Sequence, residues 1–215
     1  MSRQPTRRAR SPAAREKRRL AILDAVETLL AETPFEDISV IAVAKAAHLA
    51  KGTVYLYFPS REAMFLALFL RRTAAFASEL TSLLRSSRKA RGLAEAIAKR
   101  LSEEPLLLRL MALAPTVLER NIDVATAGAF KHGLVEALAP ATAAFEARGH
   151  PPGEGFRFLL RLNALAVGYA ELAEPSAAVA AAIAGDPALA PLRIDFVREL
   201  SATLAVLLEG TPRGQ

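Results

Sequence analysis

The sequence predicts an all-α fold of two domains, a small N-terminal helical domain and a larger C-terminal helical domain. Apolar residues recur at helical spacing along most of the 215-residue chain. No segment shows the alternation of apolar and polar residues that is typical of a strand. Proline and glycine separate the helical stretches from one another. Hydrophobic residues make up 52% of the chain, which is enough for a substantial core.

The first helix has clear start and stop signals. Ser11 is a favourable N-cap and Pro12 fits the first turn of a helix. The apolar stripe of this helix ends at Thr33, because a residue that precedes a proline avoids the α region. A second helix is expected from Ser39, which is its N-cap, and a turn at residues 48–50 leads into a third helix.

The third predicted helix covers about residues 51–57 and combines polar and apolar positions. Its polar or DNA-compatible residues are Lys51, Gly52, Thr53, Tyr55 and Tyr57. Val54 and Phe58 are four residues apart, so one helical face remains for the core. In a helix-turn-helix the second helix enters the major groove and its N-terminal residues meet the base edges. Residues 38–62 therefore predict a helix-turn-helix that binds DNA.

The distribution of charge supports a polyanionic partner. The net charge is +6, and residues 1–72 hold 13 Lys and Arg against 7 Asp and Glu, whereas the remainder holds 15 of each. Eight of the basic side chains lie in residues 1–19. Beside a helix-turn-helix this asymmetry favours nucleic acid. The alternatives are a solvated tail and a contact with anionic lipid, although the first helix lacks the apolar face of an interfacial anchor.

A long helix follows from Pro59-Ser60 and is expected to link the two domains. The sequence thus divides into residues 1–60, with a basic arm and the helix-turn-helix, a linking helix at 61–86, and a helical C-terminal domain at 87–215. Helices are predicted in the last segment at 91–102, 105–120, 123–147, 154–173, 176–184 and 192–209.

The residues AKGTVYLYFPSREAMF resemble the TetR family of bacterial transcriptional regulators. The resemblance covers about residues 15–66 and includes the first apolar stripe, the Ser39 cap, the recognition helix and the start of the long helix. It implies a homodimer that binds a near-palindromic operator as a repressor. It also implies release from DNA when a small molecule enters the C-terminal domain.

The resemblance carries specific roles over to this chain. Ser39 would place a hydroxyl and free N–H groups at a phosphate, and Lys51 would bring an ammonium to the front of the recognition helix. Gly52 would allow a close approach, and Thr53 would offer its methyl group to a thymine. Base or sugar contacts would come from Tyr55 and phosphate contacts from Tyr57 and Arg61. The alternative for the two tyrosines is that they pack at the edge of the core.

Three residues depart from the family pattern. His48 stands where the family usually has glycine, at a position that needs a positive φ. Ala50 replaces the usual Ser or Thr cap of the recognition helix. Leu56 stands where a polar aromatic residue or histidine is common. These departures bear on which operator sequence is read.

The helices at 154–173 and 192–209 are expected to form a dimer interface. The first of them is apolar on two faces, so both faces need cover. Two such helices from each of two chains would make a four-helix interface, and a charge at Leu165 or Leu204 should disrupt it. A buried helix within a single chain is the alternative. The resemblance independently places the interface on the last two long helices.

A pocket for a small, largely apolar effector is expected inside the C-terminal domain. Its candidate lining residues are Phe76, Leu107, Met111, Thr116, Phe130, Leu134, Phe158 and Asn163. Asn163 lies within an apolar stripe and needs a hydrogen-bond partner, either in the effector or in a dimer partner.

Other classes of protein find little support. The three histidines are scattered, cysteine is absent, and no HExxH motif or glycine-rich phosphate loop occurs, so we expect no enzyme, metal site or cofactor. The 11 residues between Glu174 and Asp186 are too short to span a bilayer, and a cytoplasmic protein without a membrane partner is expected. The main alternative is a dimeric DNA-binding protein, an activator or architectural protein, that has no effector. Effector-dependent release from DNA would separate the two.

Overall fold

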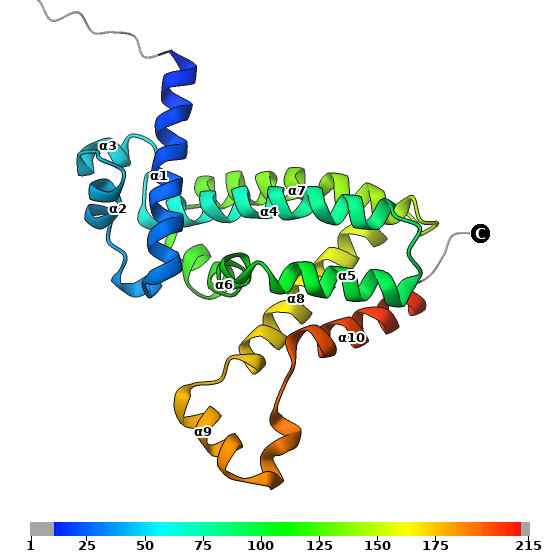
Figure 1. Ribbon diagram of the computed structural model, residues 1–215. Helices are drawn as coiled ribbons and strands as arrows, with labels where there is room; N and C mark the ends of the chain where they lie inside the picture. The colour runs from blue at the N-terminus through cyan, green and yellow to red at the C-terminus, as the bar shows by residue number, and fades with distance from the viewer. Residues whose placement is uncertain (1–10, 212–215) are drawn as a thin grey trace, which may run out of the picture. The chain divides into compact units, whose positions relative to one another are not determined.

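The computed structural model describes residues 11–211, which are helical and contain no strand. The chain divides into two compact units at Leu68 and Phe69, a point that lies inside helix α4 (Arg61–Arg85). The family-level prediction of an all-α fold with an N-terminal helix-turn-helix is confirmed (Figure 1). The basic arm at residues 1–10 lies outside the described residues.

The N-terminal unit contains α1 (Pro12–Glu32), a short 3₁₀ turn (Phe35–Asp37), α2 (Val40–Ala46), α3 (Lys51–Tyr55) and the start of α4. Ser11 Oγ accepts a hydrogen bond from the Ala14 amide at 3.2 Å, which confirms the predicted cap of α1. Its core is made by fully buried apolar side chains from each helix, among them Ile22, Leu23, Val26, Leu30, Val43, Val54 and Met64. Burial of each such side chain contributes roughly 1.5–3 kcal/mol.

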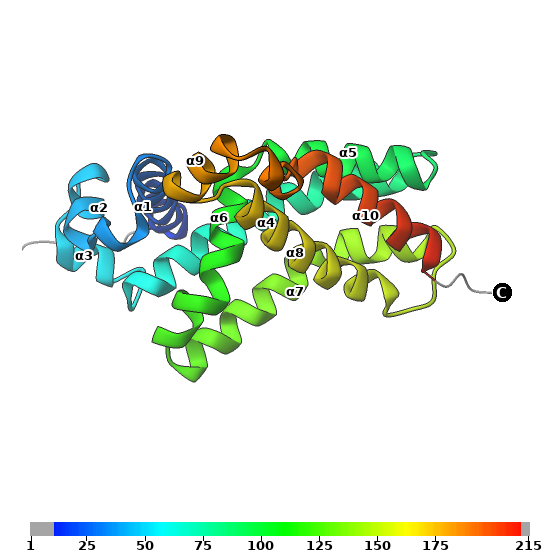
Figure 2. The same ribbon diagram turned by 90° about the horizontal axis from the view of Figure 1, so that it is seen from below.

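The C-terminal unit contains the rest of α4, then α5 (Ala90–Ser102), α6 (Pro105–Leu113), α7 (Val124–Glu146), α8 (Glu154–Ala173), α9 (Ala177–Gly185) and α10 (Phe196–Gly210). Figure 1 shows α4 beside α7 and α5 beside α10, and Figure 2 shows α8 between α7 and α10. At Gly155 a Cβ atom would lie 2.3 Å from the carbonyl oxygen of Thr142, so the close approach of α8 to α7 requires glycine at this position.

Two helices differ from their predicted extents. The stretch predicted as one helix at 105–120 is α6 followed by a π turn at Ala114–Leu118 and a 3₁₀ turn at Glu119–Asn121. Pro115 has no N–H to donate and its ring crowds the preceding turn, which explains the break in the regular helix. α10 begins at Phe196 rather than 192 because Asp195 caps it, accepting from the Arg198 amide at 2.8 Å.

α10 packs extensively against α5. Its residues Leu200, Leu204 and Leu208 are buried, and Leu204 has no exposed surface within this single chain. The expectation that Leu204 reports on a dimer interface is therefore wrong, since the residue belongs to the core of its own unit. On the same helix Val206 is 71% exposed.

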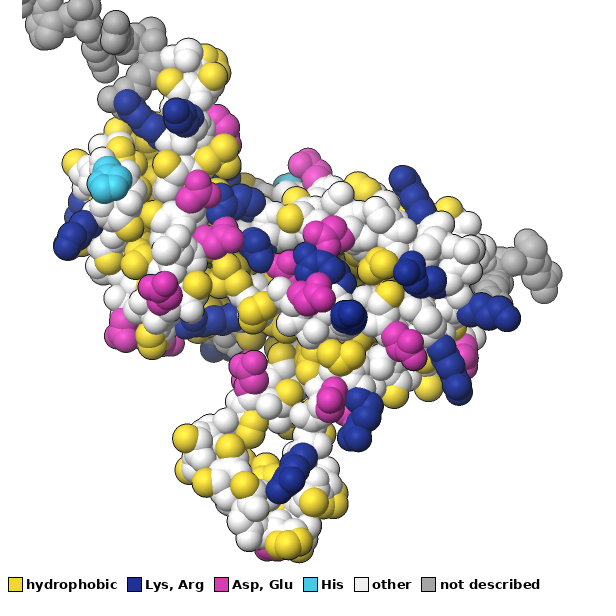
Figure 3. Space-filling model, in the orientation of Figure 1, with side chains coloured by type: hydrophobic (Ala, Val, Ile, Leu, Met, Phe, Trp, Pro, Cys, Tyr) yellow, Lys and Arg dark blue, Asp and Glu magenta, His cyan; other side chains and the backbone are white. Residues whose placement is uncertain are grey.

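α9 and the 3₁₀ turn that follows it (Pro187–Leu192) form a segment that projects between α8 and α10 (Figure 1). Ile183 is the buried residue of α9, whereas Val179 and Leu192 are exposed. Figure 3 shows that apolar side chains dominate the visible surface of this projecting segment.

An ion-pair network joins α4, α5 and the start of α6. Arg100 on α5 pairs with Glu79 on α4 and with Glu104, and Arg72 on α4 also pairs with Glu104. Glu104 is buried, so its charge requires both partners. The hydrogen bond from Arg100 lowers the pKa of Glu79 below its ordinary value.

Replacing Glu79 with glutamine should lower stability at neutral pH by less than about 1 kcal/mol, because the Glu79 side chain is 46% exposed and water screens its ion pair. A lowered folded-state pKa stabilises the protein above the unfolded-state pKa and loses that contribution as the pH falls through the folded value. The difference between parent and variant in urea titrations should therefore shrink as the pH falls below about 4.3, the ordinary pKa of a glutamate, and vanish below the lowered pKa of the folded state. Glu95→Gln is the control, since Glu95 is exposed on α5 and makes no ion pair within residues 11–211. A difference that persists in acid would contradict this account.

Candidate DNA-binding and ligand-binding sites

The start of α2 is exposed and capped. Ser39 Oγ accepts a hydrogen bond from the Ala42 amide at 3.1 Å, and Ser39 itself lies at the surface. The cap uses one of the free N–H groups of the first turn and leaves others available to an anion. This end of α2 can therefore approach a phosphate.

α3 is held by its apolar face and presents its other face outward. Val54 and Phe58 are buried, as the spacing predicted. Lys51 and Gly52 are exposed at the first turn, and Tyr55 is 45% exposed. A Cβ atom at Gly52 would have no neighbour within 4 Å, so the space in front of this turn is open. Thr53 and Tyr57 are half-buried, which places Tyr57 closer to the core edge than Tyr55.

The turn between α2 and α3 contains His48 and Ala50, two of the residues that depart from the family pattern. His48 has a φ of 54°, the left-handed conformation that the sequence predicted for this position. The Leu49 amide donates to the Ala44 carbonyl at 2.8 Å and closes the turn. Ala50 is the N-cap residue of α3 and provides no side-chain hydrogen bond. The first turn of α3 therefore has no side-chain cap, and its Thr53 amide donates instead to the Ala50 carbonyl at 2.8 Å.

Arg61 has an internal set of contacts in the N-terminal unit. Its guanidinium donates to the Phe35 carbonyl and lies over the Phe35 ring, 4.0 Å from the centroid. These contacts hold α4 to the turn that precedes α2. A variant at Arg61 would thus change the core as well as any contact with DNA, so it cannot test the predicted phosphate contact cleanly.

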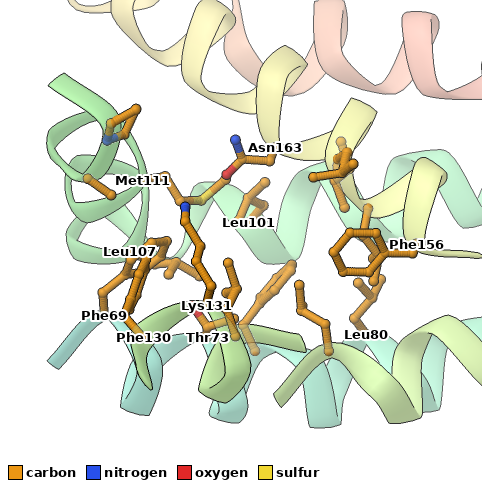
Figure 4. Close-up of a pocket in the computed structure, with 18 of the residues that line it drawn as sticks. Phe69, Thr73, Leu80, Leu101, Leu107, Met111, Phe130, Lys131, Phe156 and Asn163 are labelled. Atoms are coloured by element: carbon orange, nitrogen blue, oxygen red, sulfur yellow. The ribbon is translucent and has the colours of Figure 1, made fainter. Parts of the chain in front are cut away.

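A cavity of about 230 Å³ lies within the C-terminal unit. Figure 4 shows its walls, which come from α4, α5, α6, the π turn, α7 and α8. The lining is mostly apolar. Its polar side chains are Thr73, Glu119, Lys131 and Asn163.

Six of the eight predicted pocket residues line this cavity, namely Phe76, Leu107, Met111, Phe130, Leu134 and Asn163. Thr116 and Phe158 do not. Thr116 lies in the π turn, where its side chain is exposed and its hydroxyl donates to the Ala112 carbonyl at 2.8 Å. Phe158 is fully buried against Phe145, with ring centroids 4.4 Å apart. The regular helix assumed at 105–120 accounts for the error at Thr116.

The comparisons with known proteins match both units. Residues 22–68 match the family described as bacterial regulatory proteins, tetR family. Residues 68–215, more than half of the chain, match the family described as tetracyclin repressor-like, C-terminal domain. This chain belongs to the TetR family of transcriptional regulators. The resemblance seen in the recognition helix is thereby confirmed.

Individual TetR-family relatives are similar to this chain in part or in fold. A 56-residue segment is 48% identical to the HTH-type transcriptional regulator EthR of Mycobacterium tuberculosis, and it spans 26% of either chain. A TetR transcriptional regulator from Rhodococcus sp. RHA1 has a TM-score of 0.56 at 20% identity, over 91% of this chain and 95% of that one. The TetR-family repressor FadR of Thermus thermophilus, solved with lauroyl-CoA, has a TM-score of 0.56 at 23% identity, over 92% and 96%. The solved structures establish the shared TetR fold.

Several cavity residues of this TetR-family chain were missed in the sequence, among them Phe69, Thr73, Leu101, Glu119, Lys131 and Phe156. Phe69, Thr73 and Phe76 follow one another at helical spacing on α4, so the stripe that includes Phe76 could have identified Thr73. Nothing in the sequence indicated that Lys131 lines the cavity, because a lysine next to Phe130 is expected to face solvent.

No helix in residues 11–211 is long and apolar enough to cross a membrane.

Proposed function

We propose that this TetR-family chain is a repressor that binds a near-palindromic operator as a homodimer and leaves it when a small molecule fills the cavity. The exposed first turn of α3 is the observation that best supports operator binding. Base contacts would come from Lys51, Gly52, Thr53 and Tyr55, and phosphate contacts from Ser39, Tyr57 and Arg61.

The exposed apolar residues of α8 and α10 support the homodimer. Leu172 on α8 and Val206 on α10 are each more than half exposed in the single chain. The projecting segment adds the exposed side chains of Val179 and Leu192. Exposed apolar surface of this kind is typical of an interface, and an obligate one should bury about 2,000 Å² or more. In the dimer the two recognition helices must lie about 34–36 Å apart to read both half-sites.

The cavity favours an effector over the alternative of a dimer that only binds DNA. A mostly apolar pocket with a few polar groups is the usual form of a small-molecule site. A ligand can weaken operator binding only if it prefers a dimer whose recognition helices are differently spaced. A change in affinity of about 5–150-fold would be ordinary coupling.

Selection of bound duplexes from a random DNA pool tests the proposal directly. The recovered sequences should contain two inverted half-sites whose centres are about one helical turn apart. Sedimentation of the protein alone and with the selected duplex should give a dimer in both cases. Recovery of no common sequence would contradict operator binding, and a stable monomer that binds the duplex would contradict the spacing mechanism.

A further inference from the structure

The polar groups of the cavity are one ion pair and two separate side chains, Thr73 and Asn163. Glu119 and Lys131 form an ion pair, with 2.6 Å between Lys131 Nζ and Glu119 Oε1. Thr73 lies on α4 among apolar neighbours such as Phe69 and Phe76, and its hydroxyl makes no hydrogen bond to either member of the pair. Figure 4 shows Thr73 near the base of Phe130 and Lys131, while Asn163 lies across the cavity on α8.

Thr73 has a buried hydroxyl without a hydrogen-bond partner. The residue is 7% exposed, and its Oγ1 makes no hydrogen bond within residues 11–211. Threonines in helices usually donate to the carbonyl four residues earlier. Thr81, two turns further along α4, does so, with its Oγ1 2.6 Å from the Ala77 carbonyl. An unpaired buried hydroxyl is costly, so its persistence in a cavity wall indicates a partner that arrives from outside the chain.

A ligand in the cavity can reach the Thr73 hydroxyl after a rotation of the Thr73 side chain alone. Thr73 lines the cavity, and rotation about χ1 exchanges its hydroxyl and methyl groups. Both rotamers are available to threonine in a helix. A ligand in the cavity can therefore either donate a hydrogen bond to Thr73 Oγ1 or accept one from it.

The ion pair argues against a charged ligand. The Lys131 amine is held by Glu119 and also lies 5.2 Å from the centroid of the Phe130 ring. An anionic ligand would have to displace Glu119 from Lys131, and a cationic ligand would have to displace Lys131 from Glu119. An anion would leave Glu119, whose side chain is only 26% exposed, without its partner, whereas a cation would bring its own charge against a mostly apolar lining. A neutral ligand leaves the pair intact.

The volume sets the size of the ligand. An apolar cavity of ~150 Å³ holds one benzene molecule, which has six non-hydrogen atoms. By simple proportion a cavity of 230 Å³ holds about nine non-hydrogen atoms. This size fits a medium alkyl chain or a single substituted ring.

We propose that the ligand of this cavity is a neutral, mainly apolar molecule of about nine non-hydrogen atoms, with one hydrogen-bonding oxygen that meets the Thr73 hydroxyl. The chemical classes that fit are medium-chain alcohols, ketones and aldehydes. The inference rests on the proposed function only in taking this ligand to be the effector, because the binding itself can be measured without DNA.

Calorimetry on the full-length dimer, without DNA, tests this inference with four probes of one chain length: 1-octanol, 2-octanone, octanoate and octylammonium. The two neutral probes should bind more tightly than either ion. Thr73→Val, which keeps the shape and removes the hydroxyl, should weaken both neutral probes by about 2- to 12-fold, the range for one hydrogen bond. Without ligand this variant should be at least as stable as the parent, since the unpaired hydroxyl is gone. Thr81→Val is the matched control on the same helix and should leave probe affinity unchanged.

Each outcome of the calorimetry bears on a different part of the inference. Tighter binding of octanoate or octylammonium would overturn the neutral class, and equal affinity for parent and Thr73→Val would overturn the role of Thr73. Failure of all four probes to bind, in a protein that still binds its selected duplex, would overturn the ligand class and leave operator binding standing. Binding of the neutral probes without release of the duplex would support the ligand class and contradict the effector role under the proposed function.

Discussion

Replacing Leu204 with aspartate is expected to unfold the C-terminal unit. Leu204 is fully buried on α10, the helix that packs along α5. The substitution removes a buried aliphatic side chain and places a carboxylate without a partner in the same space. Together these effects should cost at least about 4 kcal/mol, a large part of the stability of an ordinary domain. Circular dichroism during thermal unfolding would measure the loss.

Val206→Asp is the matched control for this experiment. Val206 is two residues away on the same helix and is 71% exposed in the single chain. Its replacement should change the stability of the unit by no more than about 0.5 kcal/mol. If α10 contributes to the dimer, sedimentation should nevertheless show folded monomers that bind the operator poorly. A folded, dimeric Leu204→Asp protein would contradict the packing, and a Val206→Asp protein that remains dimeric would remove this face of α10 from the interface.

The second large effect is expected from a substitution in the recognition helix, on the affinity for the operator. Tyr55→Ala should weaken binding to the selected operator by about 1–3 kcal/mol, or 5–150-fold, if the Tyr55 side chain contacts a base. Tyr55 is 45% exposed, and the neighbouring Val54 and Phe58 hold the helix in place, so the variant should stay folded. Fluorescence anisotropy with the operator and with an unrelated duplex would separate specific from non-specific affinity, and only the specific affinity should fall.

Leu56→Ala is the control in the recognition helix. Leu56 is the next residue and is more exposed than Tyr55, but it lies at the end of α3, away from the first turn. Its replacement should reduce specific affinity less than Tyr55→Ala does. A larger loss at Leu56 would move the base contact to the end of α3, and no loss at Tyr55 would return that side chain to the core edge.

The helix-turn-helix was predictable because its signals are local. Ser39, Pro34 and the spacing of Val54 and Phe58 each act within one or two turns of the chain, and each has the structure that its position predicted. Even the left-handed conformation of His48 followed from its place in the turn. Local signals of this kind do not depend on how distant parts of the chain pack.

The cavity and the C-terminal packing were less predictable, because they depend on distant partners. Periodicity predicted the last helix, but it could not show that the side with Leu204 packs against α5 and not against a partner chain. Thr116 left the predicted lining because Pro115 breaks the regular helix with a π turn. Lys131 lines the cavity, where its amine contacts Glu119 and the Phe130 ring. The spacing of residues in the sequence could not predict these contacts.

The pairing of α10 with α5 also means that the C-terminal unit can complete its packing only late in the synthesis of the chain. Phe196, the first residue of α10, follows Ser102, the last residue of α5, by 94 positions. Ribosomes add roughly 5–20 residues per second, so α5 waits about 5–20 seconds for the helix that covers it. The contacts of the N-terminal unit, in contrast, lie within residues 1–68 and are complete far earlier. A chain that stops before α10 would thus carry a complete N-terminal unit on a C-terminal unit whose α5 lacks its cover, and exposed apolar surface of this kind makes an incomplete chain prone to aggregation.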